Sequence, residues 1–272
     1  MFDGVNITKM TPNQRLHHGM GKSFQVNNLF WQFDVYTNIM MAIYGSEKNH
    51  FQFFTRFKSS KPIQDKGEYL LQTIGLYDKR HDNPGALSYG EQRMLEMAMA
   101  FASKPKMVCR DEPSAGLPTA EVGAFTQTLR KLNGDTTMLF VAHDMDLVFS
   151  LADSIIVLYF GQIIAHGTPE EIANNPKVQE IYLGSGDEDT YDSNVNDIID
   201  KNKKEGGKFI MMLEINKINT AYGNLQVLYD LSMHIEDGSV VTLLGRNGMG
   251  KTTLMRSIVG INPPRSGNII FK

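Results

Sequence analysis

The sequence is poor in cysteine, in net charge and in long apolar runs, and each shortage excludes a class of protein. Cys109 is the only cysteine among 272 residues, so no disulfide can form within the chain and a reducing compartment fits best. Even the longest apolar runs, such as Ile155–Phe160, are far shorter than the ~20 residues that cross a bilayer. The first residues show no basic start followed by an apolar stretch, so we expect no secretory signal. The net charge of −3 argues against a nucleic-acid-binding protein.

The residues that are present suit a globular protein of one large or two small domains. Apolar residues make up 42% of the chain, which is ample for a core. The apolar periodicity predicts a mixture of helices and strands. We expect helices over 11–19, within 34–80, and over 93–101, 120–132, 145–152, 169–173 and 253–259, strands over 106–110, 136–142, 154–160, 161–165, 212–218, 228–235 and 239–244, and turns at 160–161, 220–225 and 236–238. Thr11 or Asn13 and Thr168 are the expected helix caps.

The most informative stretch is Gly245–Thr252, which fits the phosphate-loop pattern G-x-x-x-x-G-K-S/T. A short apolar strand precedes it and a helical run follows, as this pattern requires. Glycines let the backbone wrap around a phosphate, and the start of the helix attracts the negative charge. Lys251 is expected to reach the β- and γ-phosphates, and the Thr252 hydroxyl to bind Mg²⁺. The candidate nucleotide-binding residues here are Gly245, Asn247, Gly248, Gly250, Lys251, Thr252 and Thr253.

Three other positions carry residues that suit phosphate chemistry. Ser88 and Gly90, in LSYGEQ, lie at the start of an amphipathic helix, where free N–H groups make a second anion-binding position; a plain N-cap is the alternative for Ser88. Asp111 and Glu112 end an apolar strand. The first acid can hold Mg²⁺ and the second can polarise an attacking water. His143 follows the end of another strand, where open α/β sheets place their ligands, although a lone histidine is usually structural.

These motifs resemble those of the ATP-binding-cassette (ABC) ATPases. The stretch from Gln25 through LSYGEQ, Asp111–Glu112 and His143 resembles the later three-quarters of such a domain. With the closing HGTPEEIANNPKVQEIYLG, it is similar to ATPase subunits of branched-chain amino-acid importers. The last part, with MLEINKINTAYGNLQVLYDLS and LLGRNGMGKTTLMRSIVG, resembles the opening quarter of the partner ATPase. The resemblance implies an α/β P-loop NTPase fold of the ABC type with a helical subdomain, in which the order of motifs is circularly permuted.

The resemblance also implies a role for each matching residue. Tyr222 would stack on the adenine of ATP, and Gln25 would sense Mg²⁺ and the γ-phosphate. Ser88 and Gly90 would bind the γ-phosphate of ATP held by a second subunit. Asp111 would support Mg²⁺ together with Thr252 and Gln25. Glu112 would act on the attacking water and His143 would contact the γ-phosphate, so Glu112, His143 and Gln25 are the catalytic candidates.

The chain is expected to have three parts. Residues 1–184 form the ATPase body, residues 185–210 a linker with acidic residues followed by lysines, and residues 211–272 the β-subdomain with the adenine-contacting tyrosine and the phosphate loop. Because the body lacks its own phosphate loop, residues 211–272 are expected to dock onto it and complete one domain, with docking between chains as the alternative. Lys204–Gly207 can be encoded by a purine run resembling a ribosome-binding site, so the linker can also be a translated gene boundary.

Two residues depart from the family pattern. Arg110 occupies the strand position before Asp111, which is normally apolar. A buried Arg requires a carboxylate partner or a route to solvent. Pro118 replaces an acidic or polar residue after Ala115–Leu117, which weakens the cross-subunit contact expected there.

The resemblance implies an ATPase that powers import of branched-chain amino acids. ATP and Mg²⁺ would be its cofactors, and membrane permease subunits and a second ABC ATPase subunit its partners, with no nucleic acid. It would be cytoplasmic and peripheral on the inner face of the cell membrane. One alternative is a nucleotide-binding module with little or no turnover, arising as a read-through or truncated fusion of two adjacent genes. Another is the ATPase of a urea-type importer or of lipopolysaccharide export.

Overall fold

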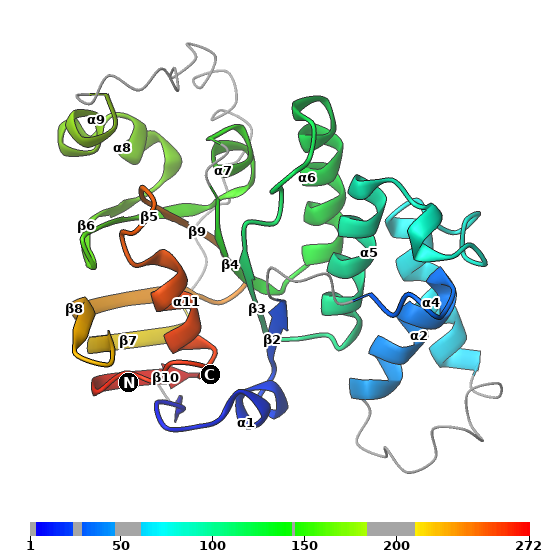
Figure 1. Cartoon of the computed structure of the whole chain (residues 1–272), viewed down its shortest axis with the longest axis horizontal. Coiled ribbons are helices and arrows are strands. Elements are labelled where there is room, and N and C mark those ends of the chain that lie inside the picture. The colour runs from blue at the N-terminus through cyan, green and yellow to red at the C-terminus, as the bar shows by residue number, and fades with distance from the viewer. Residues whose placement is uncertain (1–3, 24–28, 47–60, 143–144, 184–209) are drawn as a thin grey trace.

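The computed structural model describes residues 4–23, 29–46, 61–142, 145–183 and 210–272 (Figure 1). Its helices are α1 (Pro12–His17), α2 (Val35–Ser46), α4 (Lys61–Thr73), the 3-10 helix η2 (Pro84–Ala86), α5 (Tyr89–Ala102), α6 (Thr119–Asn133), α7 (Met145–Leu151), α8 (Pro169–Ala173), α9 (Pro176–Leu183) and α11 (Lys251–Ile258). Its strands are β1 (Val5–Asn6), β2 (Met20–Ser23), β3 (Met107–Asp111), β4 (Thr137–Val141), β5 (Ser154–Tyr159), β6 (Gln162–Gly167), β7 (Met211–Tyr222), β8 (Leu225–Glu236), β9 (Val240–Leu244) and β10 (Ser266–Phe271). Among these residues, none of the helices is both long and apolar enough to cross a bilayer.

The strands form two sheets, and both contain strands from distant parts of the chain. The six-stranded sheet has the order β2-β3-β4-β9-β5-β6, in which only β6 runs antiparallel to its neighbour. The four-stranded sheet is antiparallel, with the order β1-β10-β7-β8. Strand β9, from the C-terminal part, therefore lies between β4 and β5 (Figure 1).

The core has two parts, one on each face of the six-stranded sheet. Because side chains alternate along a strand, Val108 of β3 packs with the helices while Met107 and Cys109 face the other way. On that second face the cluster includes the inner face of the four-stranded sheet and the apolar side of α11. The helix that follows the phosphate loop is thus packed between the two sheets (Figure 1).

Arg15 of α1 ties the N-terminal part of the chain to α11. Its side chain is 1% exposed, and Nη1 donates to the carbonyls of Ser257 at 2.7 Å and Ile258 at 2.5 Å. The same guanidinium donates to the carbonyls of Thr8 at 3.0 Å and Met10 at 3.1 Å. A cation at the C-terminal end of a helix provides hydrogen-bond donors for the last carbonyls of the helix and interacts favourably with the helix dipole. Burial lowers the pKa of Arg15 to about 10, which leaves it charged at neutral pH.

Most expected elements are present, and their differences from expectation have local causes. Thr11, Ser88 and Thr168 each cap a helix with a capping box. Thr11 and Thr168 were among the expected caps, and an N-cap was the alternative role given for Ser88. The turn expected over 220–225 is wrong in extent. Strand β7 continues to Tyr222 opposite Leu225, and only two residues, the first being Gly223 at φ +52°, make the turn. Helix α9 was not among the expected helices.

Candidate nucleotide-binding site

The phosphate loop connects β9 to α11 and has the backbone that its glycines permit. Gly248 and Gly250 have φ of +81° and +102°, a region that costs other residues strain. Gly245 is buried, and a Cβ there would lie 2.6 Å from the carbonyl oxygen of Leu158 on β5. The sequence between β9 and α11 therefore folds as a tight loop against the neighbouring strand, at the start of a helix. Asn247 is exposed in this loop, and Thr253 is buried in the first turn of α11.

Lys251 lies against its own loop. Its ammonium donates to the carbonyl oxygen of Gly245 and, at 3.0 Å, to that of Arg246. Burial lowers the pKa of Lys251, whereas the nearby carboxylates of Glu112 and Asp111 raise it. A buried cation that donates to two carbonyls can bind an incoming anion by exchanging those carbonyls for oxygens of the anion.

The acidic pair lies next to the phosphate loop although it is more than a hundred residues away in sequence. Thr252 Oγ1 donates to Asp111 Oδ2 at 3.1 Å, which joins α11 to the end of β3. The N–H of Glu112 donates to the carbonyl of Val141 on β4 at 2.9 Å, and Glu112 itself has φ +48°. The structure therefore brings Lys251, Thr252, Asp111 and Glu112 together in one chain, as the motif chemistry requires.

The other candidate residues are not all in this cluster. Tyr222 ends β7 with 42% of its surface exposed, and its hydroxyl accepts from Arg256 Nη1 of α11 at 3.4 Å. Ser88 and Gly90 lie at the start of α5, and α5 and α11 are well separated in Figure 1. Gln25 and His143 lie outside the residues that the structure describes.

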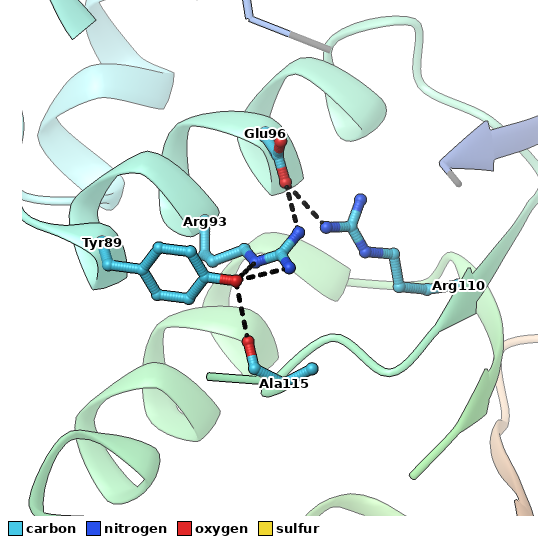
Figure 2. A network of polar contacts seen from close by, with 5 residues as sticks. All are labelled: Tyr89, Arg93, Glu96, Arg110 and Ala115. Carbon is cyan, nitrogen blue, oxygen red and sulfur yellow. Dashed lines mark hydrogen bonds and ion pairs between the residues drawn. The ribbon is translucent and has the colours of Figure 1, made fainter. Parts of the chain in front are cut away.

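A polar network beside the site involves residues that motif reasoning missed (Figure 2). Arg110 is 1% exposed, and its Nη2 donates to Glu96 Oε2 of α5 at 2.8 Å. Arg93 Nη1 donates to the same oxygen at 3.0 Å. Of the two alternatives expected for a buried Arg110, a carboxylate partner or a route to solvent, the structure has the carboxylate partner. The signal for Glu96 was its place on the buried face of a helix, where a carboxylate needs a cation.

From Arg93 the network continues to the loop that follows the acidic pair. Arg93 donates to the Tyr89 hydroxyl from Nε at 3.0 Å and from Nη2 at 2.7 Å. That hydroxyl donates to the carbonyl of Ala115 at 3.0 Å. Pro118 is the N-cap residue of α6, without a side-chain cap hydrogen bond.

The chain is similar to known transport proteins both in sequence and in fold. The sequence model described as ABC transporter matches residues 1–115 and 228–272, more than half of the chain. The model described as branched-chain amino acid ATP-binding cassette transporter matches residues 162–188. The high-affinity branched-chain amino acid transport ATP-binding protein BraF of Pseudomonas aeruginosa is 31% identical over 190 residues, which cover 67% of this chain and 74% of BraF.

Two further relatives agree with these matches. The high-affinity branched-chain amino acid transport ATP-binding protein LivG of Salmonella typhimurium is 34% identical over 181 residues, 64% of this chain and 71% of LivG. The solved structure of MJ1267, an ATP-binding cassette of an ABC transporter, superposes with a TM-score of 0.55 at 26% identity, covering 66% of this chain and 75% of that one. The chain therefore belongs to the ABC transporter family, within which it is an ATPase with the P-loop NTPase fold.

Proposed function

We propose that this chain is the ATP-hydrolysing subunit that powers import of branched-chain amino acids through a membrane permease. The observation that carries the catalytic part is the Thr252–Asp111 hydrogen bond, because it joins the phosphate-loop chemistry to the acidic pair across the sequence. The solute class is supported by the match of residues 162–188 and by the names of BraF and LivG. The subunit would work as a dimer with a second ABC ATPase, peripheral on the inner face of the cell membrane.

The residues of the site suit an ATP·Mg²⁺ complex. A hydroxyl and a carboxylate oxygen, from Thr252 and Asp111, lie 3.1 Å apart, and Mg²⁺ prefers such oxygen ligands, with substrate phosphates completing its shell. When bound, Mg²⁺ neutralises charge on the phosphates. Lys251 exchanges the carbonyls of Gly245 and Arg246 for phosphate oxygens, and the first N–H groups of α11 bind the same phosphates.

The catalytic work of this chain is the positioning of the attacking water and the stabilisation of charge. Glu112 orients the water for in-line attack on the γ-phosphorus. Gln25 and His143 assist at the γ-phosphate, and Tyr222 stacks on the adenine. Ser88 and Gly90 serve the nucleotide held by the second subunit, which suits the separation of α5 from α11 in Figure 1.

We also propose that the domain is a circularly permuted cassette with the parts 1–184, 185–210 and 211–272. Two observations support this. Strand β9 of the last part lies between β4 and β5 of the first. Strand β10 pairs antiparallel with β1, with Phe271 opposite Val5, as two strands of a hairpin would. Cleavage at a protease site inserted within 185–210 should leave the fragments associated and the ATPase active; dissociation of the fragments with no mutual affinity would refute the proposal.

The catalytic proposal is tested with Glu112→Gln. The parent chain is expected to bind ATP and release phosphate, and the variant to bind ATP with unchanged affinity while turnover falls about a hundredfold or more. Binding without turnover in the parent chain would favour the nucleotide-binding module, and absence of binding would favour a non-functional fusion. The solute is tested by uptake of labelled leucine in bacteria lacking LivG, which the parent chain should restore and Glu112→Gln should not.

A further inference from the structure

The polar network at α5 forms a closed ring with the backbone that carries the acidic pair; Figure 2 shows the side chains of this network. It leaves the backbone at Arg110, passes through Glu96, Arg93 and the Tyr89 hydroxyl, and returns to the backbone at the carbonyl of Ala115. Asp111 and Glu112 lie on the short stretch of backbone that completes the ring. Both ends of that stretch are therefore tied to one helix.

The charged part of the ring is shielded from water, whereas Tyr89 at its other end is 39% exposed. The side chains of Arg110, Glu96 and Arg93 are 1%, 3% and 9% exposed. Charge-assisted hydrogen bonds in such surroundings are strong and hold their geometry, because water does not compete for them. Burial lowers the pKa of Arg110, and the hydrogen bond that Arg110 donates to Glu96 raises it. The pair with Glu96 therefore keeps a cation at this buried position.

The stretch of backbone that completes the ring has a conformation that needs support from neighbouring contacts. Glu112 has φ +48°, which is uncommon for a residue with a side chain and persists only where neighbouring contacts hold it. At the far end, Gly116 has φ +81°, and a Cβ there would lie 2.9 Å from Cε1 of Tyr89. Tyr89 thus holds this end twice, by its hydroxyl on Ala115 and by its ring against Gly116.

We propose that Tyr89, Arg93, Glu96 and Arg110 are positioning residues for ATP hydrolysis. Their ring fixes the backbone that carries Glu112 and so sets where its carboxylate meets the attacking water. Arg110 acts here in place of the apolar residue that a buried strand would otherwise carry. The simpler alternative is that these residues form an ion-pair network of the core, which would affect stability alone. The two roles are separated by measuring turnover, nucleotide binding and stability on the same variants.

The first test is Tyr89→Phe, which keeps the ring against Gly116 and removes the hydroxyl. We expect turnover of saturating ATP to fall about ten- to a hundredfold, because small displacements of a catalytic group have effects of this size. The Kd for ATP, measured on Glu112→Gln chains with and without Tyr89→Phe, should stay within about twofold. Tyr69→Phe is the matched control, since Tyr69 is 63% exposed on α4, and it should change neither quantity.

The second test asks whether the ring acts as one unit. Arg110→Met breaks the ring at its other end, away from the LSYGEQ stretch, and should also lower turnover. The double variant should then be no slower than the slower single variant, because either change alone opens the ring. Turnover losses that multiply, or that follow the loss of thermal stability in all three variants, would overturn the proposal.

A third measurement does not depend on turnover or on the folding of Arg110→Met. The N–H of Ala115 donates to the carbonyl of Glu112 at 3.2 Å and that of Leu117 to Ser114 at 3.0 Å. In Tyr89→Phe these two amides should exchange with solvent at least about tenfold faster, while the amides of β4 keep their protection. Unchanged exchange at Ala115 and Leu117 would overturn the ring as the support of this loop, whatever the ATPase activity of the chain.

Discussion

Replacement of Arg15 by Met should show how much one buried cation contributes to joining the two ends of the chain. The substitution removes the donor for four carbonyls, two of them in the last turn of α11. A buried carbonyl left without a partner costs about 1–3 kcal/mol. If two of the four find other donors, the loss is about 2–6 kcal/mol, partly offset because a charge no longer needs burial.

We expect a net loss of about 3 kcal/mol in the free energy of unfolding, a large part of the roughly 5–15 kcal/mol of a typical domain. The corresponding fall in Tm is about 6–12 °C. Urea unfolding followed by circular dichroism measures the free energy of unfolding, and hydrogen exchange should show the largest change in α11. The control is Arg265→Met, because Arg265 is exposed and also donates to a carbonyl, that of Gly223; its effect should stay within about 0.5 kcal/mol. Equal effects of the two substitutions would refute the reasoning.

Three other predictions follow from the structure. Gly161→Ala should lower Tm by several degrees, because Gly161 has φ +75° and an added Cβ would collide with the backbone of β8; Gly123→Ala, with open space around it in α6, should instead raise stability by about 0.5–1 kcal/mol. Lys251→Met should weaken ATP binding about ten- to a hundredfold in a direct titration, through loss of charged hydrogen bonds, and a smaller effect would exclude Lys251 as a phosphate ligand. Burial and the facing imidazole of His234 lower the pKa of His166. The folded chain therefore favours the neutral ring and loses stability as the pH falls below about 6.5. His166→Gln should make the fall in Tm between pH 7 and pH 5 smaller, and an unchanged dependence of Tm on pH would contradict this.

Elements with a strong local signal were predictable from the sequence. The phosphate loop has a strand before it, a helix after it and glycines where φ is positive. Thr168 caps α8 because its hydroxyl and Glu171 form a capping box that the sequence spells out. That a buried Arg110 needs either a carboxylate partner or a route to solvent also followed from sequence, because an unpaired buried cation is costly.

Features that depend on contacts between distant residues could not be predicted in this way, and one local feature was overlooked. No spacing rule connects Tyr89 to Ala115, because their contact depends on how α5 packs beside the end of β3. The start of α9 had a signal that was missed, since Asn175 accepts from the N–H groups of Lys177 and Val178. The extent of β7 depended on pairing with β8, and tertiary pairing overrides the turn propensity of a short polar stretch.

The central place of β9 in its sheet determines when the fold can be completed during synthesis. Strands β4 and β5 need β9 between them, yet β9 is translated about 100 residues after β4, which takes roughly 5–20 s at typical bacterial rates. Until then both strands have an unpaired edge in an apolar sheet, and such edges invite pairing with other chains. The long sequence separation between paired strands such as β4 and β9 should also make folding slow. In a nascent chain of this kind the edges of β4 and β5 therefore stay unpaired for a longer interval than in a cassette whose phosphate loop is translated first.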